Sequence, residues 1–161
     1  MRIHLGTDYN GYELARSLQA GLTAEGHDVQ WHGAQEYDEG DDYPYYSIGV
    51  AQSVVKDEDD GVQAFGVICG KSGAGEVIAA NKVNGARAIT ATEEAVAHDG
   101  RNHADANILT LGSVVVPPSK ALELVRAFIS TPFTGSLDDA RRIVNTAEFE
   151  TSSTIEGWNL S

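Results

Sequence analysis

The feature that most constrains the fold is a regular alternation of short apolar runs with segments of helical periodicity. Apolar runs of a few residues suit strands and are too short for helices; they lie at residues 2–5, 29–32, 65–69, 86–91 and 108–111. Helical patterns occupy residues 12–24, 44–55, 75–82, 93–98, 118–130 and 136–149. Strands that alternate with helices predict a parallel sheet that is covered on both faces.

The chain is therefore expected to form a Rossmann-like three-layer α/β/α sandwich with a five-stranded parallel sheet. Its 161 residues, 42% of them hydrophobic, are enough for one domain with a substantial core. We place this single domain at residues 1–150. Residues 151–161 show no clear pattern and are predicted to be a C-terminal tail.

Charge and cysteine content exclude several kinds of partner. The formal net charge of −13 repels nucleic acid and anionic membranes, so neither is expected to bind. No apolar run is long enough to cross a bilayer, and the N-terminus lacks the apolar stretch of a signal peptide. The single cysteine, Cys69, cannot form an internal disulfide, and we expect a cytoplasmic protein.

A glycine-rich loop is the most distinctive local feature. It begins after the run at 65–69 and opens the helical pattern at 75–82, with glycines at positions 70, 73 and 75. Such glycines let the backbone approach a ligand, and free N–H groups at a helix start favour negative charge. The loop could hold a phosphate or the oxyanion of an enediolate, although a structural tight turn also fits. A nucleotide-binding P-loop does not fit, because three residues rather than four separate Gly66 from Gly70.

Parallel sheets bind ligands beyond the carboxyl ends of their strands. That rule points to three segments of this chain, residues 6–11, 70–76 and about 98–107.

Four segments, in order along the chain, carry a resemblance to a known family. They are Gly6-Thr7-Asp8-Tyr9-Asn10-Gly11-Tyr12, Asp42-Tyr43-Pro44, the loop and helix from Gly70 to Lys82, and His103-Ala104-Asp105-Ala106-Asn107 before a strand that ends in Gly112-Ser113. Together, these segments resemble the type B ribose-5-phosphate isomerase and galactose-6-phosphate isomerase family. The resemblance covers about residues 1–145.

The resemblance implies an activity and an assembly. Members of the family carry out aldose–ketose isomerisation through a cis-enediolate, without a metal, in a site between two subunits. We therefore expect a small sugar or sugar phosphate as substrate, no cofactor, and a homodimer or tetramer. The spacing of His98, Asp99, His103 and Asp105 fits no familiar metal-ligand pattern either.

Three residues match the family's catalytic positions. Glu76 matches the base of the glutamate branch, Ser72 a hydroxyl that assists proton movement between the two oxygens, and His103 the ring-opening histidine. The cysteine branch carries its base at the position of Gly70, so Cys69 is one residue early. It would point to the other side of its strand, and we interpret it as a buried small apolar residue. The alternatives are a helix-start role for Glu76 and a capping role for Ser72.

Other residues of these segments, with Arg142, are predicted to bind the substrate, although Lys71 is not tied to the family pattern. They are Asp8, Tyr9, Tyr43, Gly70, Lys71, Gly73, Ala74, Gly75 and Arg142. The N–H groups of residues 73–75 would form the anion hole. A turn-forming role for Asp8 and a packing role for Tyr43 remain open.

Departures from the family pattern fall mainly on phosphate binding. Val114 and Asp138 replace two arginines, which leaves Arg142 in register, and Ala104 replaces an asparagine that helps to hold the enediolate. Tyr9 replaces a histidine. Because arginine is best suited to binding phosphate, the substrate is predicted to be unphosphorylated or a shorter sugar phosphate.

Two other functions are weighed against the isomerase. One is a non-catalytic or half-site sugar-binding subunit of a hetero-oligomeric isomerase, and the other is a nucleotide-binding protein. The presence of both Glu76 and His103 favours an active isomerase.

Overall fold

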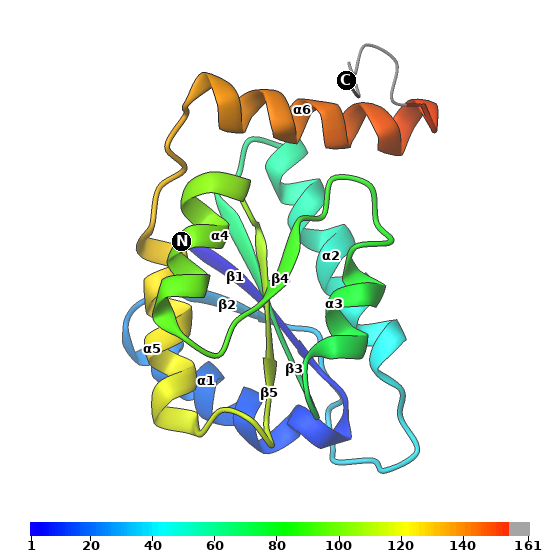
Figure 1. Ribbon diagram of the computed structural model, residues 1–161. Helices are drawn as coiled ribbons and strands as arrows, with labels where there is room; N and C mark the ends of the chain where they lie inside the picture. Colours follow the sequence, from blue (N-terminus) through cyan, green and yellow to red (C-terminus); the bar gives the residue numbers. More distant parts are fainter. Residues whose placement is uncertain (155–161) are drawn as a thin grey trace.

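The computed structural model describes residues 1–154 (Figure 1). The strands are β1 (Arg2–Thr7), β2 (Asp28–Trp31), β3 (Ala64–Gly70), β4 (Ala88–Thr90) and β5 (Ile108–Gly112). The helices are the 3-10 turn η1 (Tyr9–Gly11), α1 (Tyr12–Ala24), α2 (Tyr43–Asp59), α3 (Ala74–Ala80), α4 (Glu94–Ala104), α5 (Pro118–Ser130) and α6 (Leu137–Ser152).

The five strands form one parallel sheet in the order β2-β1-β3-β5-β4. The predicted α/β class with a five-stranded parallel sheet is confirmed. Strands β1 and β3 are direct neighbours, and Thr7 pairs with Cys69 at their carboxyl ends. After β1 the chain continues to β2, at one side of the sheet, and after β3 it continues to β4, at the other side. The order of the strands reverses between β1 and β3, and α/β sheets bind their ligands at the carboxyl ends of strands at such a point.

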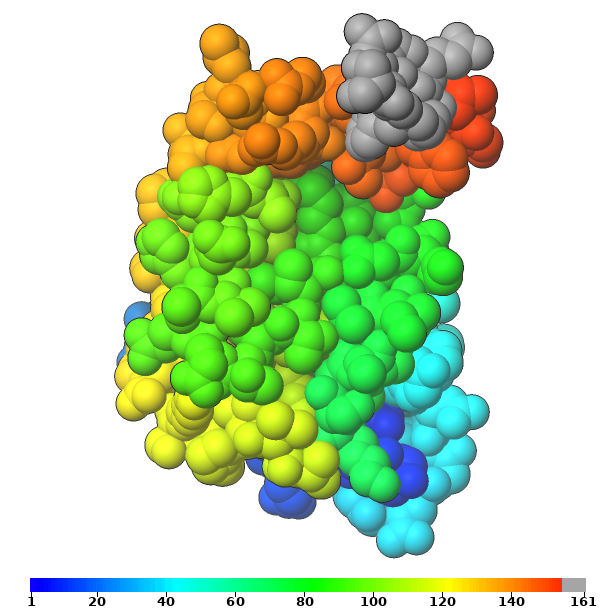
Figure 2. All heavy atoms as spheres, viewed as in Figure 1, coloured from blue at the N-terminus to red at the C-terminus, as the bar shows by residue number. Residues whose placement is uncertain are grey.

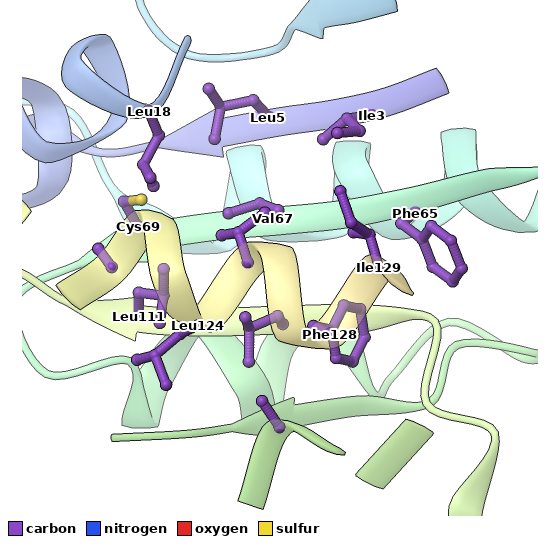
Figure 3. Packing of buried hydrophobic residues seen from close by; sticks show 14 of the residues in the cluster. Ile3, Leu5, Leu18, Phe65, Val67, Cys69, Leu111, Leu124, Phe128 and Ile129 are labelled. Carbon is purple, nitrogen blue, oxygen red and sulfur yellow. The ribbon is translucent and has the colours of Figure 1, made fainter. Parts of the chain in front are cut away.

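Alternating residues of β3 supply the cores on the two faces of the sheet. Phe65, Val67 and Cys69 pack with residues of α1, α4 and α5 in the larger core. Figure 3 shows Val67 and Cys69 on the side of β3 that carries Leu124 and Phe128 of α5. Ile68 packs on the opposite face against the residues of α2 and α3. The β3 strand is buried throughout, as its continuous apolar run predicts.

Helix α4 is longer than the sequence pattern predicts. The expected helix at 93–98 ends before Asp99 and Gly100, yet α4 continues to Ala104. Gly100 packs against the sheet, where a β-carbon would lie 2.3 Å from Cδ1 of Ile89 on β4, so a larger residue would displace the end of the Ile89 side chain. The glycine that weakened the local helical signal thus lies at the contact of the helix with the sheet.

Helix α6 lies across the amino-terminal edge of the sheet. Figures 1 and 2 show it as a ridge, in orange and red, along one end of the molecule. Glu150 of this helix accepts a hydrogen bond of 3.0 Å from the backbone N–H of Gly85, just before β4. The predicted tail begins inside α6, which ends at Ser152, and residues 155–161 lie outside the described residues. No helix within residues 1–154 is long and apolar enough to cross a membrane.

Candidate active site

The loops after β1, β3 and β5 pack tightly together at the carboxyl edge of the sheet. A β-carbon on Gly11 would lie 2.3 Å from the carbonyl carbon of Cys69, so only glycine allows this approach. Ser113 fixes the third loop, because its hydroxyl donates to the carbonyl of Asn10 at 2.7 Å and its N–H to the carbonyl of Gly70 at 2.8 Å. Three loops far apart in the sequence thus contact one another at the carboxyl edge of the sheet.

The turn of the glycine-rich loop is held by two threonines. Gly73 has a positive φ of 84°, which favours glycine, and it caps the start of α3. Its carbonyl accepts a hydrogen bond of 3.1 Å from the hydroxyl of Thr110, and Thr90 lies 2.6 Å from that hydroxyl. These contacts direct the Gly73 carbonyl toward the sheet and fix the first turn of α3.

Glu76 lies in the first turn of α3 with only 4% of its surface exposed. Its carboxylate lies against the α-carbon of Gly70, where a β-carbon would be 1.6 Å from Oε1. Burial raises the pKa of Glu76, and the nearby charge of Asp8 raises it further, while backbone N–H groups, including those of Lys71 and Gly73, partly oppose the rise. A helix start normally favours the ionised form of a carboxylate, but desolvation is the larger influence on Glu76 and gives the net rise in its pKa.

Asp8 and Tyr43 border the same site. The Asp8 carboxylate is buried and accepts hydrogen bonds from the N–H groups of Asn10 and Gly11 at 3.0 and 3.2 Å. It therefore forms the turn, and its charge also acts on Glu76. The Tyr43 ring lies directly over Gly75, where a β-carbon would be 2.6 Å from Cζ.

The other predicted residues of this edge lie in the loops around Glu76. Ser72 is exposed, and its hydroxyl accepts a hydrogen bond of 3.3 Å from the N–H of Ala74, within the turn that precedes α3. The N-cap residue of α3 is Gly73, so Ser72 does not take the capping role given as an alternative. Lys71 is exposed at the rim. The backbone N–H of Tyr9 donates to Asp41 at 2.8 Å, so Tyr9 closes the first loop onto the segment before α2.

His103 and Arg142 do not join this group within one chain. Gly66 of β3 pairs with Ile108 of β5, and Gly70 pairs with Gly112. His103 precedes the start of β5, whereas Glu76 follows the end of β3, so about 13 Å of strand separates the two edges. The prediction that residues 98–107 lie at the carboxyl edge is therefore wrong, because α4 runs back along the sheet and ends at its amino edge.

At that amino edge, Asp139 organises a cluster that the sequence reasoning missed. Its carboxylate lies 3.0 Å from Nδ1 of His103 and accepts hydrogen bonds of 2.7 Å from Arg142 and 2.7 Å from Ser136. The hydrogen bond with His103 is the main reason that the pKa of Asp139 is held well below its usual range, and Asp139 in turn raises the pKa of His103. Ser136 and Asp139 have capping-box spacing, which was the available signal.

Cys69 is buried in the larger core, on the opposite side of β3 from Glu76. Burial strongly raises the pKa of its thiol, which disfavours the reactive thiolate. Within residues 1–154, no group of three or more His, Cys, Asp or Glu side chains is placed to hold a metal ion. The groups described at the carboxyl edge are thus the buried carboxylates of Glu76 and Asp8, the Ser72 hydroxyl, the Lys71 ammonium group and backbone amides.

The structure thus defines an α/β protein with a buried glutamate, Glu76, at the carboxyl edge of its parallel sheet. A family model described as Ribose/Galactose Isomerase matches residues 3–146. The chain belongs to this family and is an enzyme of the isomerase class, as its four motifs predict.

Relatives across bacteria support this assignment. The chain is 39% identical over 150 residues to ribose-5-phosphate isomerase B of Mycolicibacterium paratuberculosis. The matched residues make up 93% of this chain and 92% of that protein. A solved structure of ribose-5-phosphate isomerase B from Clostridium thermocellum superposes with a TM-score of 0.88 at 36% identity, covering 96% of this chain and all of that one. The Mycoplasma genitalium enzyme, solved with bound ribulose-5-phosphate, gives a TM-score of 0.88 at 30% identity, with 94% and 97% covered.

Proposed function

We propose that this chain catalyses aldose–ketose isomerisation of a small sugar or sugar phosphate by metal-free proton transfer through a cis-enediolate. The observation that carries the proposal is the Glu76 carboxylate, which is 4% exposed and lies against Gly70 where the loops after β1 and β3 meet. Its raised pKa brings this base closer to neutral pH, where general-base catalysis is most effective. The Mycoplasma genitalium neighbour with bound ribulose-5-phosphate supports a sugar phosphate as one candidate substrate.

Each group has a role in the proposed reaction. Glu76 removes the proton from C2 of the open-chain aldose, and the electron pair forms the enediolate with negative charge on the carbonyl oxygen. The N–H groups of the glycine-rich loop stabilise that charge, and the Ser72 hydroxyl moves a proton between O1 and O2. Glu76 then returns its proton to C1, which gives the ketose and restores the base. His103 opens the sugar ring.

The site is proposed to be completed by a second copy of the chain, because His103 and Arg142 lie at the opposite edge of the sheet from Glu76. In a homodimer, the amino edge of one subunit would meet the carboxyl edge of the other. Exposed apolar side chains on α6, including Leu137 and Val144, are consistent with such a contact.

The arginines that a second copy would contribute to the site favour a substrate with little negative charge. Arg142 donates to Asp139 at 2.7 Å and Arg141 to Asp138 at 2.7 Å, so aspartates already neutralise both arginines. We propose an unphosphorylated sugar or a shorter sugar phosphate as the preferred substrate. The competing function, a half-site subunit that binds sugar without turning it over, shares the same fold and loops.

The experiment is an isomerisation screen of the purified chain in heavy water, with deuterium incorporation at the transferred carbon followed by NMR. Each C4 to C6 aldose is paired with its phosphate, and Glu76→Gln is the control. Turnover that is lost in Glu76→Gln supports the proposal. Absence of exchange for every sugar rejects it in favour of the half-site subunit, and efficient ribose 5-phosphate turnover that Arg142→Ala abolishes rejects the preference for an uncharged substrate.

A further inference from the structure

A second group of polar side chains lies apart from Glu76, where β1, β2 and α2 meet. Its members are Arg2, His4, His32 and Asp57. The buried imidazole of His4 on β1 contacts Oδ2 of Asp57 through Nε2 at 2.9 Å. On its other side, His4 Nδ1 lies 2.8 Å from Nε2 of His32, just after β2. Arg2 donates to both oxygens of Asp57, at 3.1 and 3.0 Å. The four side chains form one continuous hydrogen-bonded chain from Arg2 to His32.

The chain of hydrogen bonds determines which nitrogen of His32 is free. The ionised Asp57 can only accept, so Nε2 of His4 donates to it. The contact with His4 Nδ1 occupies Nε2 of His32, so Nδ1 of His32 is the ring nitrogen with no hydrogen-bond partner in residues 1–154. Burial is the main cause that lowers the pKa of His32, which favours an uncharged ring.

His32 lines a cavity of about 640 Å³ between the segment after β2 and the first half of α2. That volume is within the range of small-molecule sites, roughly 300–1,000 Å³. Trp31, Tyr45 and Tyr46 provide aromatic surfaces in its wall, and Gln35 and Gln52 provide amides. None of the residues of the predicted isomerase site lines it.

The lining of the cavity carries no formal charge. Charged residues make up 22% of the chain, yet no Asp, Glu, Lys or Arg of the described part lines this cavity. An ionic ligand would find no partner there and would lose its hydration. Aromatic walls accept the apolar faces of rings, while imidazole and amide groups in the same wall select for hydroxyl groups.

We infer that this cavity is a second binding site, for an uncharged ring molecule with a hydroxyl group that hydrogen-bonds Nδ1 of His32, such as an unphosphorylated sugar. Asp57 and His4 act as positioning residues that hold the His32 ring in one orientation. The site is separate from Glu76, so binding here does not depend on isomerase activity.

The test uses methyl β-D-galactopyranoside and methyl β-D-ribofuranoside, which cannot open and so cannot be isomerised. In a Trp158→Phe background, Trp31 is the only tryptophan and reports binding by fluorescence. Nitrogen-15 NMR of the imidazoles reports the environment of Nδ1 of His32. We expect a saturable change in Trp31 emission and a shift of the Nδ1 signal of His32 when a glycoside binds.

Variants separate this site from the isomerase site. His32→Phe keeps a ring but removes the hydrogen-bonding nitrogen and should weaken binding roughly three- to tenfold, the cost of one hydrogen bond. Tyr45→Ala should also weaken binding, and because Tyr45 is 82% exposed it serves if His32→Phe does not fold. Glu76→Gln should bind the glycosides unchanged. The inference is overturned by unsaturable signals, by an Nδ1 signal of His32 that does not move on saturation, or by binding that is lost in Glu76→Gln and kept in Tyr45→Ala.

Discussion

The carboxylate of Glu76 occupies the space beside Gly70 in which any other residue would place its side chain. A β-carbon on Gly70 would lie 1.6 Å from Oε1 and 2.2 Å from Cδ of Glu76. The two residues come from consecutive elements, the end of β3 and the first turn of α3. The glycine therefore creates the pocket that buries the carboxylate, and this burial raises the pKa of Glu76.

Gly70→Ala should displace the Glu76 carboxylate while the sheet remains folded. A shift of about 1 Å in a catalytic group can cost roughly 10²-fold in rate, so we expect a fall in kcat of that order. The measurement is steady-state kinetics beside circular dichroism. Gly49→Ala is the matched control, since a β-carbon there meets nothing within 4 Å and alanine favours the helix. Equal activity of Gly70→Ala and the wild type would contradict this geometry.

Glu76→Gln should reduce kcat by about 10²–10⁴-fold, because the amide cannot accept the proton. Substrate binding should change little, since the side chain keeps its size. A lowered affinity with an unchanged kcat would assign Glu76 to binding instead of proton transfer.

The pH profile should carry the signature of the buried base. Because the pKa of Glu76 is raised and the base works only when ionised, activity should fall on the acidic side at a higher pH than for an ordinary glutamate. Asp8→Asn removes the nearby negative charge that raises the pKa of Glu76, so it should move the acidic limb of kcat/KM to lower pH. Because asparagine also caps a turn well, the first loop should keep its conformation in this variant. Asp59→Asn, at an exposed position, is the control, and an identical shift in both variants would show a general charge effect.

Mixed oligomers test whether the site is shared between copies. Glu76→Gln and His103→Asn should each be nearly inactive alone. When the two variants are unfolded together and refolded, mixed dimers should regain activity, because one of their two sites pairs an intact Glu76 with an intact His103. Mixtures that stay inactive would place both residues in one subunit's site.

His103 should titrate above an ordinary histidine, because the hydrogen bond with Asp139 raises its pKa. This pair stabilises the fold below the unfolded pKa of histidine and loses that contribution as the pH rises through the raised folded pKa. Ionised Asp139 also contributes to the stability of the fold, and this contribution is lost only in strong acid because the pKa of Asp139 is depressed. An NMR titration should show a lower His103 pKa in Asp139→Asn. An unchanged value would exclude the contact in solution.

Cys69 should be chemically inert. Its thiol is fully buried, and burial strongly raises its pKa, so iodoacetamide should leave the native enzyme active. Cys69→Ala should retain activity and lose about 1 kcal/mol of stability, through the small cavity that it leaves. Inactivation by the reagent at the native cysteine would contradict this orientation of β3.

Local patterns in the sequence predicted the sheet and most of the helices, because periodicity depends on neighbours a few residues apart. The fold class and the burial of Cys69 follow directly from this. The early end assigned to α4 was wrong because Gly100 lies within the helix and packs against Ile89, eleven residues before it. A contact of that kind has no local signature.

The sequence by itself determined the α/β architecture and the family, since both are carried by ordered motifs and periodic apolar runs. Only the tertiary structure decided the environment of each site residue. Desolvation of Glu76 depends on how the loops after β1 and β3 pack, and the position of His103 depends on the direction in which α4 runs. The link between His4 and His32 likewise arises from the pairing of β1 with β2. Burial and contacts between distant segments are set in three dimensions, and they control charge and hydrogen bonding far more than sequence neighbours do.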